Sequence, residues 1–457
     1  MQLLELVNRF VWGIPALILI LGVGIYITVC CCAPQIRLFP KAISEFGKRF
    51  RKKDSGYQAL CTALAATVGT GNVAGVAGAI AIGGPGAVFW MWVSAFLGMG
   101  TKYAEALLSV RYRCKNAAGE TVGGPMYIIE KGLGVSWKPL AMVYCFLGII
   151  AAFGVGNSTQ INAVIDSVNS AITAFGGKVN ERQNVLLGVL LAALIAAMLF
   201  GGASRIGKIA EQLVPFAAGV YILLGIGILI IKAQALPEAI SAIFRGAFSP
   251  RAVTGGTIGS LWQCIQVGVS RGVFTNEAGM GTAAIAHGAS DVHHPAEQGL
   301  MGIMEVFLDT IVICTITALV ILSSGIPVTY GTDGGAALTT AAFTSVYGGW
   351  ASVILAFALC CFALATILGW GLYGIRCAQY IFGENVWRKF VYLQVITVIF
   401  STLLKTGTVW MLAETVNGLM AIPNLIALGI LTPEVLRLTK NYIYGFRHIP
   451  NLTKVQK

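Results

Sequence analysis

Charged side chains are scarce in this sequence of 457 residues: Asp, Glu, Lys and Arg make up 11% of it, whereas 56% of the residues are hydrophobic. A soluble globular protein carries about 25% charged residues. So few charges cannot cover a surface that faces water, so the composition argues strongly against a soluble enzyme. It predicts a protein embedded in a lipid bilayer.

The sequence also lacks the motifs of a catalytic or metal site. Its eleven cysteines include no Cys-x-x-Cys pair, and most of them lie within apolar stretches. Neither a zinc site nor a disulfide framework is therefore indicated. No P-loop, HExxH or GxSxG motif occurs in the chain. We therefore expect no enzymatic activity.

Long apolar stretches, by contrast, follow one another along the whole chain. Most of them reach the length of about 20 residues that a helix needs to cross the hydrocarbon core. The first is too long for a signal-peptide core and has no basic leader, so we expect it to be a retained helix. The stretches predict an all-α polytopic membrane protein with about eleven transmembrane helices, at residues 11–33, 57–82, 86–110, 139–160, 184–201, 210–231, 257–288, 299–323, 349–374, 389–403 and 406–432.

The 31 lysines and arginines are spread unevenly over the loops between these stretches. Seven of them lie in loop 34–56, which we expect in the cytoplasm because cytoplasmic loops carry an excess of Lys and Arg. Alternating sides from that loop gives 22 basic residues inside and 7 outside. This predicts a multi-pass protein of the cell (inner) membrane with its N-terminus outside and its C-terminus in the cytoplasm. The net charge of +12 then reflects topology and is no evidence for a nucleic-acid partner.

Two of the expected spans contain closely spaced glycines, in residues 69–72 (GTGN) and 279–281 (GMG). These are the second and seventh spans, so they cross the membrane in opposite directions. Paired spans interrupted by glycine in corresponding positions indicate a transporter binding site. We therefore predict a single transporter domain with an extra N-terminal helix, two five-helix repeats of inverted topology with one broken helix each, and a cytoplasmic tail, at residues 11–33, 57–231, 253–432 and 433–457.

The physical reason lies in the backbone. Each glycine costs a helix about 1 kcal/mol relative to alanine, and an unwound turn frees backbone groups. Freed N–H groups at the start of a half-helix attract an anion, and freed carbonyls coordinate a cation. Helix packing is the other role of glycine in membranes, and for Gly75, Gly78 and Gly288 it explains the residue at least as well.

Two stretches resemble a known family. Residues 83–98 (GGPGAVFWMWVSAFLG) are similar to the signature of the alanine/glycine:cation symporter family, and residues 270–281 (SRGVFTNEAGMG) resemble the same family. The resemblance covers essentially the whole chain. It implies a sodium-coupled, in some members proton-coupled, importer of alanine or glycine. It also implies the five-plus-five inverted-repeat fold of the bacterial leucine transporter.

The resemblance further implies which residues hold the substrate and the ion. The backbone N–H groups of Thr70 and Gly71 would bind the substrate carboxylate, and Phe274 and Met280 would line the pocket for its side chain. Two sodium sites would take their ligands from the first, sixth and eighth core helices, at Ala65, Thr67, Val68, Asn72, Thr275, Ala363, Thr366 and Ile367. Asn276 and Glu277 depart from the leucine transporter, which has small or apolar residues there. Sodium is the expected coupling ion, and no other cofactor is expected.

Three polar or aromatic residues are further candidates for contact with the substrate: Gln160, Thr366 and Trp370. Gln160, in the fourth span, can hydrogen-bond a small polar molecule, although Gln also joins transmembrane helices. Trp370 lies one turn after Thr366 and on the same face. It can form a wall that keeps larger amino acids out, although Trp is also common at the membrane interface.

Ionisable residues inside the spans are functional candidates because burying one costs roughly 2.5–3.5 kcal/mol. Lys102 and Glu105 are spaced i, i+3 on one helix face and predict an intrahelical pair or an inner gate. Glu277 lies in the second break. There we expect it to pair with Arg271, or else to bind the substrate ammonium or balance the charge of the cation.

Glu305 and Asp309 share one helix face, at i, i+4. A proton relay is one reading of this pair, but we favour a structural role in hydrogen bonding. His287, His293 and His294 lie at or near loop 289–298. We expect this cluster to be a solvated loop rather than a metal site.

Together with the resemblance, these observations predict a secondary active symporter that imports alanine and/or glycine with sodium by alternating access. The alternative is a proton-coupled transporter of small neutral amino acids. An ion channel is less favoured, because a channel usually builds its filter from a ring of elements and this chain offers one inverted pair. The expected partners are alanine or glycine, sodium and the lipid bilayer, with no nucleic acid and no obligate protein partner.

Overall fold

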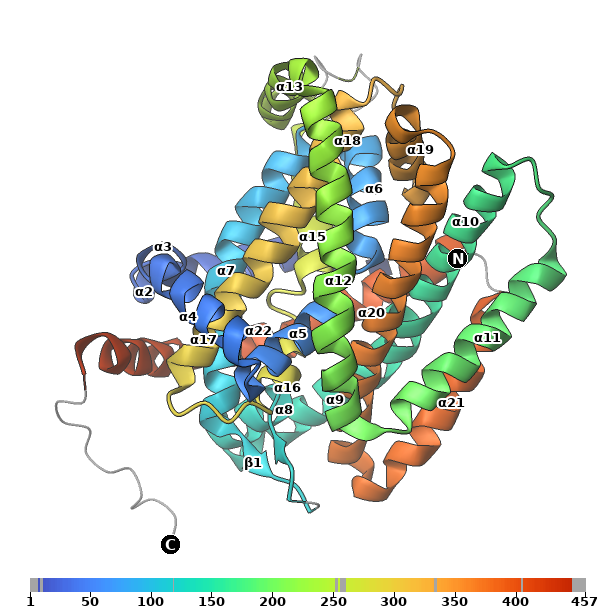
Figure 1. Ribbon diagram of the computed structural model, residues 1–457. Helices are drawn as coiled ribbons and strands as arrows, with labels where there is room; N and C mark the ends of the chain where they lie inside the picture. Colours follow the sequence, from blue (N-terminus) through green and yellow to red (C-terminus); the bar gives the residue numbers. More distant parts are fainter. Residues whose placement is uncertain are drawn as a thin grey trace, which may run out of the picture.

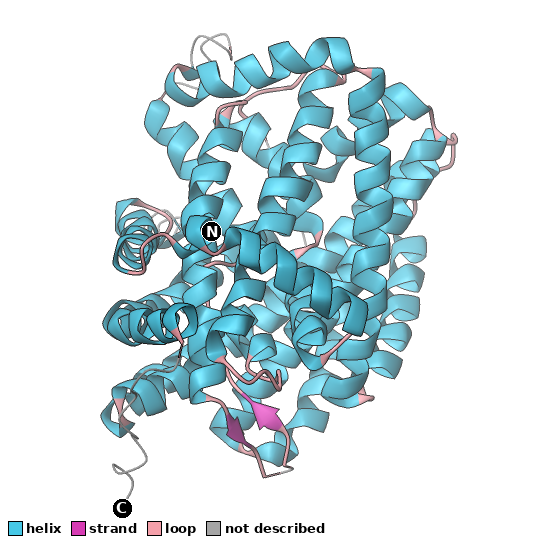
Figure 2. Cartoon of the chain, turned by 60° about the vertical axis from the view of Figure 1, so that its left-hand side comes forward, coloured by secondary structure: helices cyan, strands magenta, loops and turns pink. Residues whose placement is uncertain are grey.

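The computed structural model describes residues 7–8, 11–117, 119–250, 254, 260–332, 335–403 and 406–445. Most of them are helical, which confirms the all-α prediction. A short hairpin pairs β1 (Cys114–Lys115) with β2 (Thr121–Val122) in antiparallel register. Figure 1 shows the helices side by side in one bundle, and Figure 2 shows the hairpin at the lower end of it.

The first part of the chain begins with an apolar helix and a basic helix, and the first broken helix follows them. Its elements are α2 (Ile14–Cys30), α3 (Pro34–Arg37), α4 (Phe39–Lys52), α5 (Ser55–Thr67), the π-helical turn η1 (Gly71–Gly75), α6 (Val76–Gly83) and α7 (Ala87–Tyr112). After the hairpin come α8 (Pro125–Tyr127), η2 (Ile128–Leu133), η3 (Val135–Trp137), α9 (Lys138–Phe153), η4 (Gly154–Ser158), α10 (Thr159–Ala174), α11 (Glu181–Leu199), α12 (Gly202–Ile231), η5 (Ala233–Ala235) and α13 (Leu236–Phe248).

The second part opens with the other broken helix. Its elements are α15 (Leu261–Asn276), α16 (Thr282–His287), α17 (Pro295–Val306), η6 (Phe307–Cys314), α18 (Thr315–Ser323), α19 (Gly335–Tyr347), α20 (Trp350–Phe382), η7 (Glu384–Val386), α21 (Trp387–Ser401) and α22 (Thr406–Tyr444). The helix α22 runs on through Pro423 and Pro433, so the expected tail from residue 433 is helical as far as Tyr444.

Six helices in the described part of the chain are long and apolar enough to cross a bilayer: Val135–Ala174, Glu181–Leu199, Gly202–Ile231, Pro295–Ser323, Trp350–Phe382 and Met411–Tyr444. A seventh candidate is the first broken helix, whose halves Ser55–Thr67 and Gly71–Gly83 meet at 52°. Each of these overlaps an expected span. The total of about eleven spans and the inverted repeat stay predictions.

Some parts of those predictions fall outside the described residues. They are the start of the seventh span at 257, the start of the second repeat at 253, and the tail beyond 445. Six basic residues counted for the topology also lie outside them: Arg9, Arg251, Lys405, Arg447, Lys454 and Lys457.

Helix α7 packs against α15, which leads into the second break, and against α17, which follows α16. The contact is close enough that glycine is needed in it. A Cβ on Gly302 of α17 would lie 2.6 Å from the backbone oxygen of Lys102 on α7. This approach brings α17 side chains against those of α7, which sets the geometry of the site described below.

The substitution Gly302→Ala tests this contact. The added methyl group meets backbone rather than a flexible side chain, so we expect a loss of about 1–3 kcal/mol of stability. Gly219→Ala in α12 is the matched control, because a Cβ there meets nothing within 4 Å. The measurement is the thermal unfolding midpoint in detergent, and equal midpoints for the two variants would contradict the packing.

Candidate functional site

The first break separates α5 from η1. Val68 leaves helical geometry with a ψ of 95°. The Asn72 side chain takes the place of a helical hydrogen bond there, since its Oδ1 accepts from the Gly69 N–H at 2.8 Å. The N–H groups of Thr70 and Gly71 stand in the first turn of the second half-helix, where no carbonyl of that helix can reach them. The break therefore offers backbone donors where the sequence predicts them.

The second break separates α15 from α16 and uses left-handed backbone. Glu277, Gly279 and Gly281 have φ values of 54°, 91° and 77°. Glycine adopts such angles readily, whereas a residue with a Cβ seldom does. The two predicted glycines thus allow the chain to turn out of one half-helix and into the next.

Two side chains of α7 bind the backbone that this break sets free. The Glu105 carboxylate, through Oε1, accepts the N–H groups of Gly279 and Gly281, both at 3.0 Å. One turn earlier, the Lys102 ammonium donates to the Glu277 carbonyl at 3.3 Å. An anion thus lies at the start of α16 and a cation at the end of α15, and each matches the partial charge of its helix end. Asn424 of α22 completes the contact with a 2.7 Å bond to Glu105.

The expected intrahelical pair of Lys102 and Glu105 is therefore wrong. The Lys102 Nζ lies 3.1 Å from the Glu305 Oε1, and both side chains are fully buried. The i, i+3 rule treats a helix in isolation. In this bundle, Glu105 accepts hydrogen bonds from backbone groups of the second break. The close approach of α17 brings Glu305 to Lys102 as its partner.

The expected pairing of Glu277 with Arg271 is wrong as well. Glu277 accepts a 2.9 Å bond from the Trp370 Nε1 and another bond from the Thr282 hydroxyl. Arg271 pairs instead with Glu414 at 2.8 Å. Because α15 stays helical through Asn276, residues six apart point in different directions around its axis.

His287 does not lie in a solvated loop. It is fully buried in α16, its Nε2 lies 2.9 Å from the Glu305 Oε2, and its Nδ1 lies 2.7 Å from the Gln298 amide. Lys102, Glu305 and His287 thus form a continuous buried chain. His294 caps α17 by accepting the Ala296 N–H. Among the described residues, no group of three His, Cys, Asp or Glu is placed to hold a metal ion.

The two breaks face each other in the middle of the bundle. A Cβ on Gly71 would lie 3.0 Å from the Thr275 Cγ2, and one on Gly69 would lie 2.6 Å from the Thr366 Oγ1. The Thr70 hydroxyl donates to the Gln160 Oε1 at 3.1 Å. Five residues that the sequence analysis placed in the site, Thr70, Gly71, Gln160, Thr275 and Thr366, therefore come together.

Thr366 carries the clearest sign of a binding site. Its hydroxyl oxygen is buried and has no hydrogen-bond partner within the described part of the chain. Buried polar atoms are nearly always paired, so an orphan needs an explanation. It lies beside the unwound backbone at Gly69, where α5 and α20 touch at Ala66 and Gly369. A bound cation or a polar ligand group would satisfy it.

The remaining predicted residues are all buried, but they differ in the contacts that they already make within the protein. Phe274 lines a cavity, whereas Met280 is fully buried in the second break. Trp370 is fully buried, and its Cβ stands so close to Gly156 that any side chain there would collide with it. The Ile367 carbonyl already accepts a 3.4 Å bond from Gln394, which makes it the weakest of the expected sodium ligands.

Asp309 is the residue whose place the sequence analysis missed. Its Oδ1 accepts from the Asn72 amide at 2.7 Å and its Oδ2 from the Thr310 hydroxyl at 2.8 Å. Thr310 in turn accepts from the Asn276 amide at 3.1 Å. The carboxylate thus joins the first break to the second. An acid within an apolar span was the available signal, but nothing in the sequence pairs residue 309 with residue 72.

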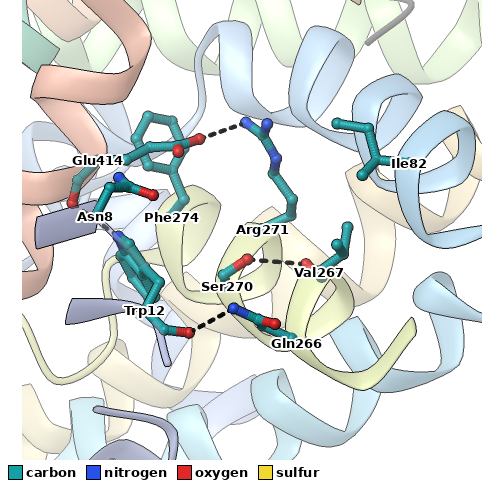
Figure 3. A pocket seen from close by; sticks show the side chains of 9 residues that line it. All are labelled: Asn8, Trp12, Ile82, Gln266, Val267, Ser270, Arg271, Phe274 and Glu414. Carbon is teal, nitrogen blue, oxygen red and sulfur yellow. Dashed lines mark hydrogen bonds and ion pairs between the residues drawn. The ribbon is translucent and has the colours of Figure 1, made fainter. Parts of the chain in front are cut away.

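Two cavities approach the breaks from opposite ends of the bundle. One of about 230 Å³ lies beside Ile82 at the end of α6, and its wall includes Phe274 and the pair Arg271–Glu414 (Figure 3). The other, of about 430 Å³, lies beside Ser55 at the start of α5 and is walled by the hairpin, α12, α16 and α20. The first broken helix therefore has a cavity at each of its ends.

Comparisons with known proteins agree with this picture. The model of the sodium:alanine symporter family matches residues 1–451. The chain is 44% identical to the sodium/alanine symporter AgcS of Methanococcus maripaludis over 453 residues, 96% of this chain and 97% of the relative. It is 36% identical to the probable sodium/glutamine symporter GlnT of Bacillus subtilis over 456 residues, 96% of this chain and 91% of the relative.

Among solved structures, the chain resembles MhsT in complex with L-phenylalanine, with a TM-score of 0.59 and 15% identity. The match covers 84% of this chain and 97% of that one. At this identity the likeness concerns the fold alone. It confirms the leucine-transporter-type fold that the family resemblance implies.

Glu105 gives a direct test of how the second break is held. Glu105→Ala leaves two backbone N–H groups and one N–H of the Asn424 amide without an acceptor, each at a cost of about 1–3 kcal/mol. We expect loss of folded protein, whereas Glu105→Gln keeps one acceptor oxygen and folds with a lowered midpoint. Glu238→Ala, at a side chain that is 78% exposed, is the control. The measurement is the yield and the unfolding midpoint in detergent. Equal behaviour of all three variants would show that α7 does not anchor the break.

Proposed function

Because the chain belongs to the sodium:alanine symporter family, we propose that it imports alanine and/or glycine together with sodium across the cell membrane by alternating access. Membership makes the chain a cation-coupled amino acid transporter of the membrane and not an enzyme. The finer proposal is carried by the meeting of the two breaks at Gly71 and Thr275, next to a Thr366 hydroxyl that has no partner among the described residues.

The substrate carboxylate would bind at Thr70 and Gly71. Their N–H groups lie at the start of the half-helix that continues into α6, and helix N-termini favour anions. The side-chain pocket would be bounded by Phe274, Met280 and Trp370. The Trp370 ring is held by Glu277 on one side and by the contact with Gly156 on the other. Because Trp370 is fixed in this position, the pocket cannot widen on that side, which supports a small amino acid as the substrate.

Sodium would bind to oxygen atoms around the same break. Unwound carbonyls of broken helices coordinate sodium in transporters, and those of Ala65, Thr67 and Val68 adjoin the contact of α5 with α20. The Thr366 hydroxyl and the carbonyl of Ala363 would complete one site. Asn72 and Thr275 would contribute to the other, where the Asp309 carboxylate, bound to Asn72, adds negative charge.

Alternating access requires a closure at each end of the site. At the cavity near Ile82, the pair Arg271–Glu414 spans from α15 to α22. At the opposite end, Arg49 binds Asp54 at 2.9 Å and Glu297 at 3.0 Å. Arg49 thereby ties the start of α5 to α17. We propose that these two sets of ion pairs open in turn, the first to the outside and the second to the cytoplasm.

Proton coupling is the second candidate. The buried chain of Lys102, Glu305 and His287 joins a carboxylate to an imidazole in direct contact. Such intramembrane chains serve as proton relays in pumps and transporters. The sodium proposal and the proton proposal differ in which gradient drives uptake.

Uptake by reconstituted liposomes distinguishes these candidates. We expect labelled alanine and glycine to accumulate under an inward sodium gradient and to equilibrate without accumulation when potassium replaces sodium at the same pH. Accumulation under an inward proton gradient without sodium would favour the proton-coupled reading. Uptake that ignores both gradients would falsify symport.

Asn72→Ala tests the placement of the ion. The variant loses the side-chain oxygen in the break, so we expect the half-saturating sodium concentration to rise about tenfold, the equivalent of about 1.4 kcal/mol. Binding of alanine at saturating sodium should fall much less. Asn184→Ala, remote from the break in α11, serves as the control. Normal sodium affinity in Asn72→Ala would place the ion elsewhere.

A further inference from the structure

Helix α4 presents three different surfaces around its axis. One contains Ala42 and Arg49, which are buried against the bundle. A second, the α4 apolar edge, consists of Ile43 and Phe50, whose exposed fractions are 49% and 50%. The third, the α4 basic face, carries the exposed bases Lys41, Lys48, Arg51 and Lys52.

The sequence spacing explains this division. Ile43 and Phe50 are seven residues apart, which is close to two helical turns, so they lie on one line along the helix. Lys41 and Lys48 are seven apart in the same way, and Lys52 follows one turn later. At about 100° per residue, the line through Ile43 and Phe50 lies nearly opposite the line through these lysines. The apolar edge and the basic face are therefore on opposite sides of α4.

Contacts with the bundle fix α4 in this rotation. Arg49 is held by Asp54 and Glu297, and at the other end of the helix the Phe39 ring meets that of Phe307 edge to face, with centroids 4.9 Å apart. The helix cannot turn its apolar edge inward without breaking these contacts. Two large apolar side chains on this edge thus remain exposed in the folded protein.

The charge of the basic face is only partly balanced by the protein. Lys48 binds Glu45 at 2.9 Å, whereas Lys41, Arg51 and Lys52 take part in none of the ion pairs found among the described residues. The end of α22 adds aromatic groups, since the Tyr442 ring lies 3.8 Å from the Lys41 Nζ.

We propose that α4 is a docking surface for anionic phospholipid headgroups. A helix with exposed apolar residues on one side and bases on the opposite side lies in a membrane interface, with the apolar side chains among the acyl chains and the bases at the level of the lipid phosphates. A nucleic acid would complement the bases but leave Ile43 and Phe50 in water. Because loop 34–56 carries seven bases and is expected in the cytoplasm, the lipid would come from the inner leaflet.

Docking at this surface acts on a helix end that moves in the proposed alternating access, and this consequence rests on that proposal. Asp54, which Arg49 binds, is also the N-cap of α5 and accepts the Tyr57 N–H at 2.9 Å. Lipid bound to α4 thereby holds the start of the first broken helix. The position of that helix end would then depend on the lipid composition of the inner leaflet.

Photocrosslinking of the full-length protein tests the proposal without relying on transport. Phe50→p-benzoylphenylalanine places a photoreactive ring on the apolar edge, in liposomes of phosphatidylcholine with a minority of phosphatidylglycerol. Mass spectrometry identifies the lipids attached after illumination. We expect phosphatidylglycerol to be enriched among the adducts about threefold or more over its share of the bilayer, since each base near the surface attracts anionic lipid.

Two comparisons locate the source of the enrichment. Combining Lys48→Gln, Arg51→Gln and Lys52→Gln should lower the ratio to that of the bilayer. The matched control, Lys178→Gln with Arg182→Gln and Arg245→Gln, removes three exposed bases from the opposite end and should leave the ratio unchanged. Phe357→p-benzoylphenylalanine on α20, whose native side chain is 57% exposed, should report the composition of the bilayer in every background.

The outcomes separate cleanly. A ratio at position 50 equal to that of the bilayer, or unchanged by loss of the three α4 bases, would overturn the proposal. Adducts mainly with a second protein chain would make α4 an interface between copies and overturn it too. Should the triple variant fold poorly, raising the salt concentration with the unaltered bases should reduce the enrichment, since exposed charges are screened. Enrichment that persists in high salt would count against docking by charge.

Discussion

Every backbone group that a broken helix sets free inside a bilayer needs a partner within the protein, because lipid tails offer none. The fold is arranged around this requirement at two places. At the second break, Lys102 and Glu105 of one continuous helix bind the freed carbonyl and N–H groups. At the first, Asn72 binds the backbone within its own segment. The close packing of α7 against α17 follows from the arrangement at the second break. The charges that stabilise this break must themselves be paired and shielded from water.

Asp309 connects the two breaks through hydrogen bonds. Hydrogen bonds run from Gly69 through Asn72 to Asp309, and from there through Thr310 to Asn276. A ligand that repositions the Asn72 side chain must therefore alter the surroundings of the second break. Coupling between ion and substrate requires that each ligand favour one of two arrangements over the other, and a continuous buried chain is a physical route for that preference.

The position of both breaks was readable from the sequence, because glycine pairs within apolar stretches have few uses other than unwinding or packing. The family was readable too, from the stretch at residues 83–98. The partners of the buried charges were not. Lys102 and Glu105 suggested each other by spacing, yet the groups that bind Glu105 stand more than 170 residues away along the chain. His287 lies at the end of the expected span 257–288 and was grouped with the histidines of the adjoining loop, since nothing in the sequence pairs it with Glu305.

Gly156 carries a consequence of another kind. It belongs to the π-helical turn η4, and it leaves room for Trp370 because it has no side chain. In the proposed site the tryptophan bounds the chamber, so residue 156 controls the chamber width without touching its contents. A substitution at a position like 156 can thus change which amino acid fits, while the unwound segments and their ion ligands stay the same. A difference in substrate, such as that between relatives named for alanine and for glutamine, can therefore arise at positions that do not contact the substrate.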